Sequence, residues 1–324
     1  MPEPTIDLSI VTVNWNSVDY LRECFSSIYR FTQGLTFEII VVDNASPTRD
    51  VDDLGVQFPE TRIIKSDTNL GFAGANNLGF KHSVGTYVLF LNPDTVLQSP
   101  AINQMVDHIR SLPNAGILGC KLLNTDLSVQ LSSIQKFPKI LNQVLDIEFL
   151  QLRWPGCPLW DISPLMSDSQ HPVEVDMISG ACMLMRREVF AAVNMFSEDY
   201  FMYAEDIDLN YKVKKAGYTN YYVGDTRIVH HGGGSSSRQK VNQYKTIMKY
   251  RAMRLYYRKN RGSSYEVLYR AALGASAAGR LLFLGLMYLF GNVAWKRSTV
   301  SMAAEKWKII LKWALGRYES PINN

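Results

Sequence analysis

The chain has 324 residues, of which 47% are hydrophobic and 20% are charged, which is typical of a folded globular protein and argues against disorder over most of its length. The net charge of +4 conceals an unequal distribution. Residues 238–318 contain 17 Lys and Arg against two acidic residues, whereas residues 1–237 contain 17 basic and 27 acidic residues. Two regions of opposite charge indicate two different tasks.

The four cysteines show no CxxC or other paired metal-binding spacing, and three of them lie in apolar surroundings. We interpret them as reduced, packed thiols, which favours a cytosolic environment. The first four residues lack a basic region followed by an apolar stretch, so we expect no signal peptide.

Strands and helices alternate through the first half of the chain. Apolar runs predict strands, and the segments between them predict helices. The expected strands are 6–14, 37–43, 62–65 and 87–91, and the expected helices are 18–31 and 71–82. Helices of about ten residues or more between strands favour parallel pairing with right-handed crossovers. We therefore expect an α/β fold with an open, mostly parallel sheet flanked by helices.

The loops after these strands meet at one edge of such a sheet, where α/β proteins bind their ligands. Asp43 and the residues after it could equally form an Asx turn that caps the next segment. Gly71 and Gly74 could serve close helix–sheet packing, or could let backbone amides approach an anion at a helix N-terminus. The turn after the first strand has no glycine, which disfavours a Rossmann dehydrogenase. The polar residues expected at this edge include Asn14, Asn16, Asp43, Asn44, Ser46, Asn69, Asn76, Asn77, Asn92 and Asp94.

Asp94 follows the apolar run 87–91. A lone carboxylate at the tip of a central strand can hold a divalent metal ion against a phosphate group. Downstream, His230 and His231 end another apolar strand and precede a Gly/Ser loop, 232–237. A flexible linker with incidental histidines is the alternative, but imidazole can complete a metal site that Asp94 begins. The glycines would then let the loop close over a bound phosphate group.

Three carboxylates, Glu205, Asp206 and Asp208, stand at the start of another expected helix. Acids in a first helical turn often only complement the helix dipole, but three within four residues exceed that need. A carboxylate that projects from a helix start into a cleft can remove a substrate proton, so Asp206 is the candidate general base. Glu205 and Asp208 would orient it or bind substrate hydroxyls. Ser179 and Gly180 form a small turn that leads into a strand.

Together these segments resemble the family 2 inverting glycosyltransferases of GT-A fold, particularly the bacterial rhamnosyltransferase-like branch. The resemblance covers roughly residues 5–237 and lies in the order and spacing of the motifs. The motifs are TVNWN at 12–16, VVDNAS at 41–46, NLGFAGANN at 69–77, LNPD at 91–94, SGACMLMRR at 179–187, YAEDIDL at 203–209 and HHGGGSS at 230–236.

The resemblance implies roles for individual residues. Asp43 would read the pyrimidine base, Asp206 would be the general base of the ED motif, and Asp94 would be the last carboxylate of the DxD metal motif. Asn92 replaces the first carboxylate of that motif, which leaves one fewer charge for Mg²⁺ or Mn²⁺. His230 would then be a compensating ligand, with His231 as the alternative. The expected substrate-binding residues are Asn14, Asn16, Asp43, Asn69, Gly71, Gly74, Asn76, Asn92, Ser179, Gly180, Glu205 and Asp208.

The resemblance also implies a reaction, namely direct displacement with inversion at the anomeric carbon. The expected donor is a nucleoside diphosphate sugar, with dTDP-rhamnose first and UDP-hexoses next. The expected acceptor is a lipid-linked saccharide in the synthesis of bacterial cell-surface polysaccharides. A metal-dependent nucleotidyltransferase or phosphodiesterase would require a richer metal cluster, and a silent sugar-binding or scaffold protein would not need the acidic helix start.

Residues 238–324 form a second expected region, which is helical. The stretch 271–295 is apolar except for Arg280, and its uncharged part, 281–295, is shorter than the roughly 20 residues that span a bilayer. Flanking Lys, Arg and Trp residues better fit helices that lie on an anionic membrane surface. A membrane span and a helical subdomain packed on the catalytic core are the alternatives. The long apolar stretch disfavours nucleic-acid binding. We therefore expect a peripheral location on the cytoplasmic face of the inner membrane.

Overall fold

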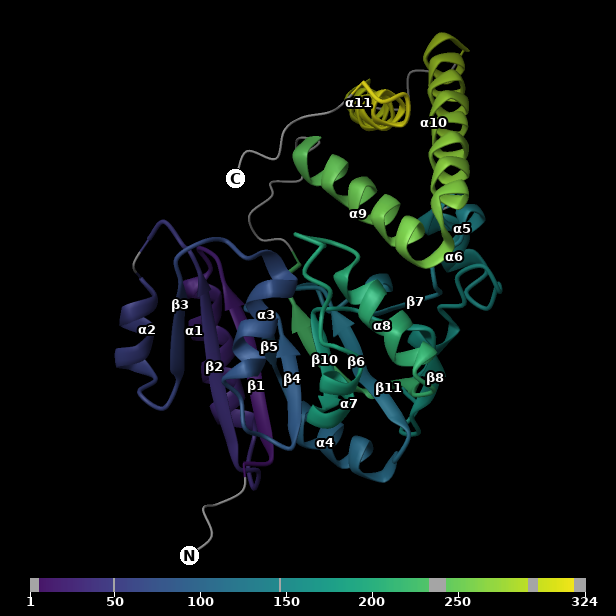
Figure 1. Cartoon of the computed structure of the whole chain (residues 1–324). Coiled ribbons are helices and arrows are strands. Elements are labelled where there is room, and N and C mark those ends of the chain that lie inside the picture. Colours follow the sequence, from purple (N-terminus) through teal and green to yellow (C-terminus); the bar gives the residue numbers. More distant parts are fainter. Residues whose placement is uncertain (1–5, 49, 146, 233–242, 291–296, 318–324) are drawn as a thin grey trace, which may run out of the picture. The chain divides into compact units, whose positions relative to one another are not determined.

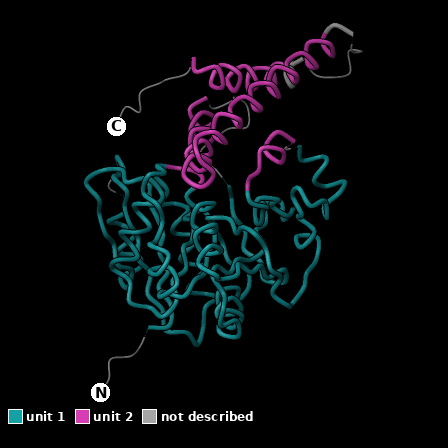
Figure 2. The backbone as a smooth tube through the Cα atoms, turned by 45° about the vertical axis from the view of Figure 1, so that its right-hand side comes forward, with its two compact units in different colours: residues 1–137, 147–201, 205–234 teal, residues 138–146, 202–204, 235–324 magenta. Residues whose placement is uncertain are grey.

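The computed structural model describes residues 6–48, 50–145, 147–232, 243–290 and 297–317. The chain divides into two compact units (Figure 2). Unit 1 consists of Met1–Phe137, Ile147–Phe201 and Glu205–Gly234, and unit 2 consists of Pro138–Asp146, Met202–Ala204 and Ser235–Asn324. The boundary predicted at residue 237 and most of the Gly/Ser loop fall within 233–242, outside the described residues.

Unit 1 is an α/β fold whose elements follow the predicted order (Figure 1). Each expected strand and helix of the first half lies within two residues of its predicted ends. Its strands are β1 (Leu8–Asn14), β2 (Phe37–Asn44), β3 (Arg62–Ser66), β4 (Tyr87–Leu91), β5 (Thr95–Leu97), β6 (Ala115–Leu123), β7 (Ile134–Gln135), β8 (Val173–Val175), β9 (Met177–Ile178), β10 (Cys182–Arg186) and β11 (Thr219–His230). Its helices are α1 (Val18–Phe31), α2 (Val51–Gln57), α3 (Gly71–Lys81), α4 (Ala101–Ser111), α6 (Glu148–Arg153), α7 (Arg187–Ala192) and α8 (Glu205–Lys215).

The main sheet has the order β3-β2-β1-β4-β10-β6-β11-β5, with β8 paired to β11. The first four strands of this order are parallel, as expected. In contrast, β10 runs antiparallel between β4 and β6, and β5 runs antiparallel to β11. β5 follows β4 after a turn of three residues, 92–94, which is too short for a crossover helix. β10 enters the main sheet from β9, which pairs with β7 outside that sheet. The sheet is therefore mixed but largely parallel.

Apolar side chains alternate between the two faces of the sheet. On β1, Leu8 and Ile10 point into one core with α1 and α4, and Val11 points into the other with α3, α7 and α8. Phe90 of β4 packs in this second core against Phe190 and Phe196, with ring centroids 4.6 and 5.0 Å apart. Both faces are thus covered by helices, so the sheet edges carry the exposed polar groups.

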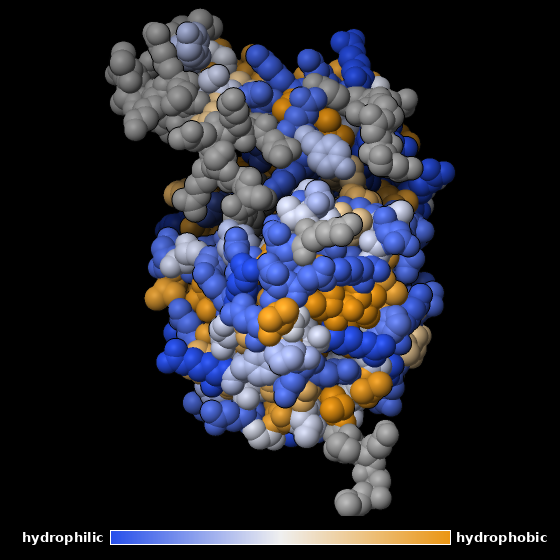
Figure 3. All heavy atoms as spheres, turned by 90° about the vertical axis from the view of Figure 1, so that its left-hand side faces the viewer, coloured by the Kyte–Doolittle hydropathy of each residue, from blue (hydrophilic) through white to orange (hydrophobic). Residues whose placement is uncertain are grey.

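The edge strand β3 carries the charged side chains Arg62 and Lys65 outward. Figure 3 shows the face on this side of the molecule, where apolar residues form separate small groups among hydrophilic ones. Charged residues on an edge strand prevent the strand from pairing with another sheet.

Unit 2 is helical and consists of α5 (Ile140–Val144), α9 (Gln243–Arg261), α10 (Ser263–Phe290) and α11 (Arg297–Ala314). The buried face of α10 presents Tyr269, Leu273 and Ala277. Arg280 donates a hydrogen bond to the carbonyl of Val144 (2.8 Å), and its guanidinium lies 4.4 Å from the ring centroid of Trp307. The single charge within the apolar stretch therefore has polar and aromatic partners inside this unit.

By length and composition, one helix among the described residues could cross a membrane, namely Ser263–Tyr288 within α10. Only 11% of its most apolar window is buried. Its outer face is therefore apolar and exposed, with Val267, Leu268, Leu282, Phe283, Leu286 and Tyr288 on it.

Candidate active site

The ends of β1 and β2 are joined by side chains. Asn14 and Asp43 occupy paired positions, and Asn14 Nδ2 donates to Asp43 Oδ1 over 2.7 Å. Asn14 Oδ1 accepts from the amide and the hydroxyl of Ser17, each at 3.0 Å. Ser46 Oγ accepts from Asn14 Nδ2 (3.2 Å) and from the amide of Asn16 (3.1 Å). Since both Asn14 and Asp43 are buried, this network fixes the direction of the Asp43 carboxylate.

Among the described residues, four of the eight non-glycine residues with positive φ lie in the turns after β1 and β2 or directly before α8. Asn16 (φ 53°) and Ala45 (φ 58°) are left-handed in the turns after β1 and β2. Tyr203 (φ 71°) and Ala204 (φ 64°) are left-handed directly before α8. Each such residue costs on the order of 1–3 kcal/mol, a cost that proteins tend to retain at functional sites.

Asn44, to which the sequence analysis assigned no role, ties β2 to the start of α3. Its Nδ2 donates to Asn69 Oδ1 (2.9 Å) and to the carbonyl of Gly71 (3.2 Å), and its Oδ1 accepts from the amide of Leu70 (2.7 Å). The amide of Gly71 donates to Asn69 Oδ1 (2.9 Å), and the amide of Phe72 donates to the Phe201 carbonyl (3.0 Å). An anion at this helix start would have to compete with these acceptors.

Gly71 holds the start of α3 against the loop before α8. Its φ is +70°, and a Cβ atom there would lie 2.2 Å from the carbonyl oxygen of Phe201. Gly74 and Asn76 lie inside α3, where a Cβ on Gly74 would lie 3.0 Å from that of Leu70. Asn76 Nδ2 donates to the carbonyl of Phe72 (2.9 Å). The described contacts of these two residues are therefore within the helix.

Asp94 and His230 come together from the ends of β4 and β11. Asp94 Oδ1 lies 3.2 Å from His230 Nε2, and Asn92 Nδ2 lies 3.3 Å from the same nitrogen. The side chains of Asp94 and His230 are 15% and 14% exposed. His231 points elsewhere, since its ring lies 5.4 Å from that of Tyr20. A carboxylate and an imidazole nitrogen are suitable metal ligands, so this pair fits a divalent ion that takes its other ligands from phosphate and water.

Gln130, which no sequence motif indicated, contacts His230 on its other side. His230 Nδ1 lies 2.9 Å from Gln130 Oε1, and Gln130 Nε2 donates to the His230 carbonyl over 2.6 Å. Among the described residues, no three His, Cys, Asp or Glu side chains cluster as a metal site.

Asp206 lies at the start of α8 beside the turn before β10. Its Oδ2 accepts from the amide of Gly180 (3.1 Å), and its Oδ1 accepts from the amide of Ile207 (2.8 Å). Gly180 permits this approach, because a Cβ there would lie 3.2 Å from that of Asp206. Burial raises the pKa of Asp206, and the two amide donors oppose the rise. Ser179 shares the turn, where its Oγ accepts from the amide of Ala181 (3.3 Å).

Asn210, one turn further along α8, was also missed. Its Oδ1 accepts from the amide of Ile178 (2.9 Å), and its Nδ2 donates to the carbonyls of Ile178 (2.9 Å) and Asp206 (2.8 Å). Asp208 accepts from Ser197 Oγ (2.6 Å) and from the hydroxyl of Tyr200 (3.2 Å). Asn210 and Asp208 therefore anchor the helix that carries Asp206.

Two hydrogen bonds to backbone carbonyls bring these groups together. The amide of Asn92 donates to the carbonyl of Ala181 (3.0 Å), so the turn that carries Asp94 lies against the turn that contacts Asp206. Thr12 Oγ1 donates to the carbonyl of Leu91 (2.6 Å), which joins the ends of β1 and β4. The residues predicted from distant motifs therefore share one edge of the sheet.

Glu205 is the most perturbed acid in this region. It is 7% exposed, and its Oε2 has no hydrogen-bond partner among the residues that the structure describes. Burial, together with the nearby charge of Asp206, raises the pKa of Glu205 to about 8. At neutral pH this carboxyl is therefore mostly protonated.

We expect Glu205→Gln to stabilise the protein at neutral pH. The raised pKa favours folding while Glu205 is protonated in both states, below about pH 4.5, and this contribution is lost progressively as the pH rises towards 8. Gln does not ionise, so the gain in the free energy of unfolding should reach roughly 3 kcal/mol at pH 7 and vanish near pH 4. Denaturant unfolding at both pH values measures it. Glu188→Gln, at an exposed first-turn position of α7, is the control, and a gain independent of pH would contradict the assignment.

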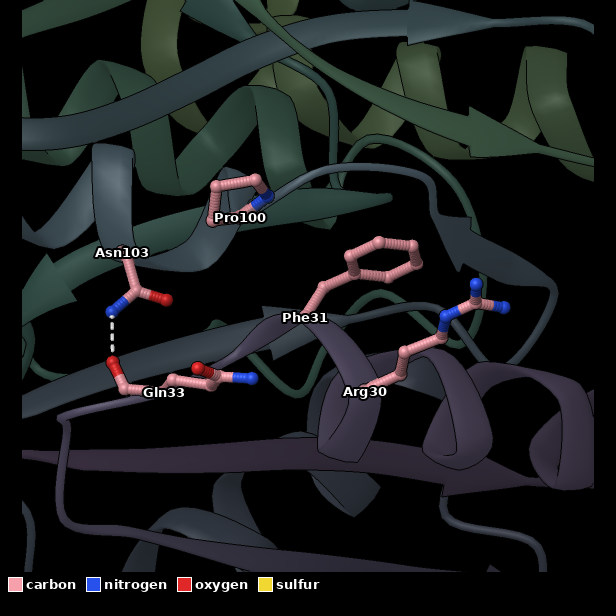
Figure 4. A pocket seen from close by; sticks show the side chains of 5 residues that line it. All are labelled: Arg30, Phe31, Gln33, Pro100 and Asn103. Carbon is pink, nitrogen blue, oxygen red and sulfur yellow. Dashed lines mark hydrogen bonds between the residues drawn. The ribbon is translucent and has the colours of Figure 1, made fainter.

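A shallow hollow of about 370 Å³ lies elsewhere in unit 1 (Figure 4). It is lined by Arg30 and Phe31 at the end of α1 and by Gln33, whose carbonyl accepts from Asn103 Nδ2 (2.7 Å). Helix α1 starts at the site edge after β1, and its 14 residues extend about 21 Å away from it. This hollow is therefore separate from the candidate site.

The chain also has recognisable relatives among known proteins. The family model for glycosyl transferase family 2 matches residues 9–193. N-acetylglucosaminyl-diphospho-decaprenol L-rhamnosyltransferase from Mycobacterium tuberculosis is 29% identical over 249 residues, which cover 72% of this chain and 79% of that protein. Rhamnosyltransferase WbbL from Escherichia coli K12 is 29% identical over 168 residues, which cover 50% of this chain and 61% of that protein.

The fold is also found among solved structures. Mannosyltransferase PcManGT from Pyrobaculum calidifontis, solved with GDP-Man and Mn²⁺, matches with a TM-score of 0.59 at 15% identity, covering 98% of this chain and 88% of that chain. The expected GT-A fold is thereby confirmed. Because this family model matches more than half of the chain, the chain belongs to glycosyl transferase family 2.

Proposed function

We propose that the protein transfers a hexose, with inversion, from a nucleoside diphosphate donor to a lipid-linked saccharide. dTDP-rhamnose, which would supply L-rhamnose, is the preferred donor because two relatives are rhamnosyltransferases. A lipid-linked acceptor is preferred because one of them is named for a diphospho-decaprenol-linked sugar. The observation that carries the proposal is the hydrogen bond from Asn92 to Ala181, since it brings the Asp94–His230 pair and Asp206 to one place. The product would serve the synthesis of bacterial cell-surface polysaccharides.

In this mechanism Asp206 removes the proton from the acceptor hydroxyl as that oxygen attacks the anomeric carbon. The amides of Gly180 and Ile207 hold the carboxylate in place. The raised pKa of Asp206 makes it a stronger base than an exposed aspartate once it is ionised. Attack from the face opposite the leaving group inverts the anomeric centre.

Asp94 and His230 would hold Mg²⁺ or Mn²⁺, which would neutralise charge on the departing nucleoside diphosphate. Asp43, directed by Asn14, would accept hydrogen bonds from the base. The rest of the donor would be lined by Asn16, Asn92 and the segment 69–76. Asn44 and Asn69 would fix the backbone at the start of that segment. Ser179, Gly180 and Glu205 would face the acceptor side, and Asp208 would support the helix that carries the base.

A donor screen tests this function. The purified protein is incubated with dTDP-rhamnose, UDP-glucose, UDP-N-acetylglucosamine or GDP-mannose and Mn²⁺, with and without a polyprenyl-diphosphate-linked N-acetylglucosamine. We expect acceptor-dependent release of dTDP and a product of inverted anomeric configuration. Release of UDP would identify the alternative UDP-hexose transferase. Release of nucleoside monophosphate would identify a nucleotidyltransferase or phosphodiesterase and overturn the proposal.

We also propose that residues 1–237 are the catalytic domain and that residues 238–324 attach it peripherally to the cytoplasmic face of the inner membrane. The surface of α10 and the charge of this region support the membrane attachment. The apolar outer face of α10 is exposed among the described residues of unit 2, and the excess of Lys and Arg in this region complements anionic lipid headgroups. Arg280 is turned to Val144 and Trp307, so it does not interrupt that face. Nucleic acid would leave the apolar face uncovered.

The α10 face makes a direct prediction about membrane binding. Leu282 and Phe283 are 67% and 61% exposed, and each would contribute about 1.5–3 kcal/mol if buried in lipid. We expect the double variant Leu282→Glu/Phe283→Glu to bind phosphatidylglycerol vesicles at least about tenfold more weakly in sedimentation at low salt. Val56→Glu, at an 84% exposed position of α2, is the matched control. Equal binding by the double variant and the control would exclude α10 as the attachment surface.

A further inference from the structure

We propose that Gln130 is a positioning residue that fixes the ring of His230 for cation binding. The inference rests on the proposed metal site and goes beyond it, because Gln130 belongs to none of the sequence motifs. It lies 100 residues before His230, in the loop after β6, and it is buried.

Two opposed hydrogen bonds determine which nitrogen of His230 carries the proton. The His230 carbonyl can only accept, so the group 2.6 Å from it must be the Gln130 amide nitrogen. The amide oxygen of Gln130 therefore faces His230 Nδ1 at 2.9 Å. Since that oxygen can only accept, Nδ1 must be the donor. The neutral ring then has its lone pair on Nε2.

This lone pair points at the proposed site. Nε2 lies 3.2 Å from Asp94 Oδ1, so two electron-rich atoms face each other. A positive charge between them, as a metal ion or a proton on Nε2, turns this repulsion into attraction. Asn92 Nδ2, at 3.3 Å, can donate to the same lone pair while no cation is bound. The two hydrogen bonds between Gln130 and His230 thus present the imidazole in the form that a cation requires.

Gln130 is itself held in place. Its amide donates to the carbonyl of Leu122 (2.9 Å), and its carbonyl accepts from the amide (3.1 Å) and the hydroxyl (2.7 Å) of Ser133. β6 and β11 are parallel neighbours, with Leu123 opposite Val229. The segments that carry Gln130 and His230 therefore extend from two strands that are paired with each other. A side chain anchored in this way can orient a ligand without moving.

The test measures Mn²⁺ binding to the full chain by the loss of the free-ion signal in electron paramagnetic resonance. We expect Gln130→Leu to weaken Mn²⁺ binding by about 10- to 100-fold. His230→Ala should weaken it at least as much, and the double variant should be no worse than His230→Ala alone, because Gln130 acts through that ring. Ser128→Ala lies in the same loop, where its exposed hydroxyl contacts Asn124 and Asp126 but not Gln130 or His230, and it should bind Mn²⁺ normally.

A spectroscopic measurement separates positioning from a purely structural role. In ¹⁵N-histidine-labelled protein without metal, His230 should show the pattern of a ring protonated at Nδ1. Gln130→Leu removes the acceptor and should lose this pattern, whereas Ser128→Ala, at an exposed position of the same loop, should keep it. Additive effects of Gln130→Leu and His230→Ala, or an unchanged pattern in Gln130→Leu, would overturn the inference. Normal Mn²⁺ binding by His230→Ala would instead reject the proposed metal site.

Discussion

Replacing Asp206 by Asn is expected to lower the rate of sugar transfer by about 10²- to 10⁴-fold while leaving donor affinity nearly unchanged. The loss follows from the geometry, because Asp206 is held by two amide donors at the edge that also carries Asp94. Asn has the same shape but cannot take up the proton of an acceptor hydroxyl. Its NH₂ group would also face one of the two amides that now donate to the carboxylate.

The measurement is kcat with a saturating acceptor, together with the calorimetric affinity for the donor. Glu188→Gln is the matched control, since Glu188 also stands in the first turn of a helix but is exposed at the other end of β10. We expect it to retain full activity. A kcat for Asp206→Asn within tenfold of the parent protein would reject Asp206 as the general base.

Sequence patterns alone predicted the strands in the parallel half of the sheet and their ends to within two residues. The strands around Asp43 and Leu91 are continuous apolar runs that end in Asn, Asp or Pro, so period and turn chemistry agree on type and boundary. The strand β10 was expected after the turn at Ser179 and Gly180, but its antiparallel direction was not, and β5 was not expected at all. The turns 92–94 and 179–181 carry no periodic signal of their own.

The candidate site was recovered only in part, for a related reason. Motifs indicate residues that stand at strand ends, such as Asp94 and His230. Asn44, Gln130 and Asn210 act through side-chain hydrogen bonds to residues 25, 100 and 32 positions away, and a single sequence contains no local signal for such contacts. Hydrogen bonds of these side-chain amides can be identified only in the folded structure, where the segments lie next to each other.

Replacing Asp94 by Asn is the second change with a large expected effect. Asn92 already stands where the resembled motif has a carboxylate, so Asp94→Asn would leave no acidic side chain in this turn. Loss of the ligand charge is expected to lower metal-dependent turnover by about 10²- to 10³-fold, which corresponds to several kcal/mol of charge stabilisation. Steady-state kinetics over a range of Mn²⁺ concentrations measure it. Full activity of this variant in the presence of a chelator would exclude a metal held by Asp94.

The opposite substitution, Asn92→Asp, tests the same site from the other direction. Asn92 Nδ2 lies 3.3 Å from His230 Nε2, so a carboxylate at position 92 would add a second charged ligand beside Asp94. Without metal the two carboxylates repel each other, and the melting temperature should fall below that of the parent protein. With Mn²⁺ the added ligand charge should tighten binding, so saturating metal should raise the melting temperature by more than it does in the parent protein. Because repulsion alone predicts only the first effect, a variant that is destabilised without metal and gains nothing from Mn²⁺ would place the cation site elsewhere.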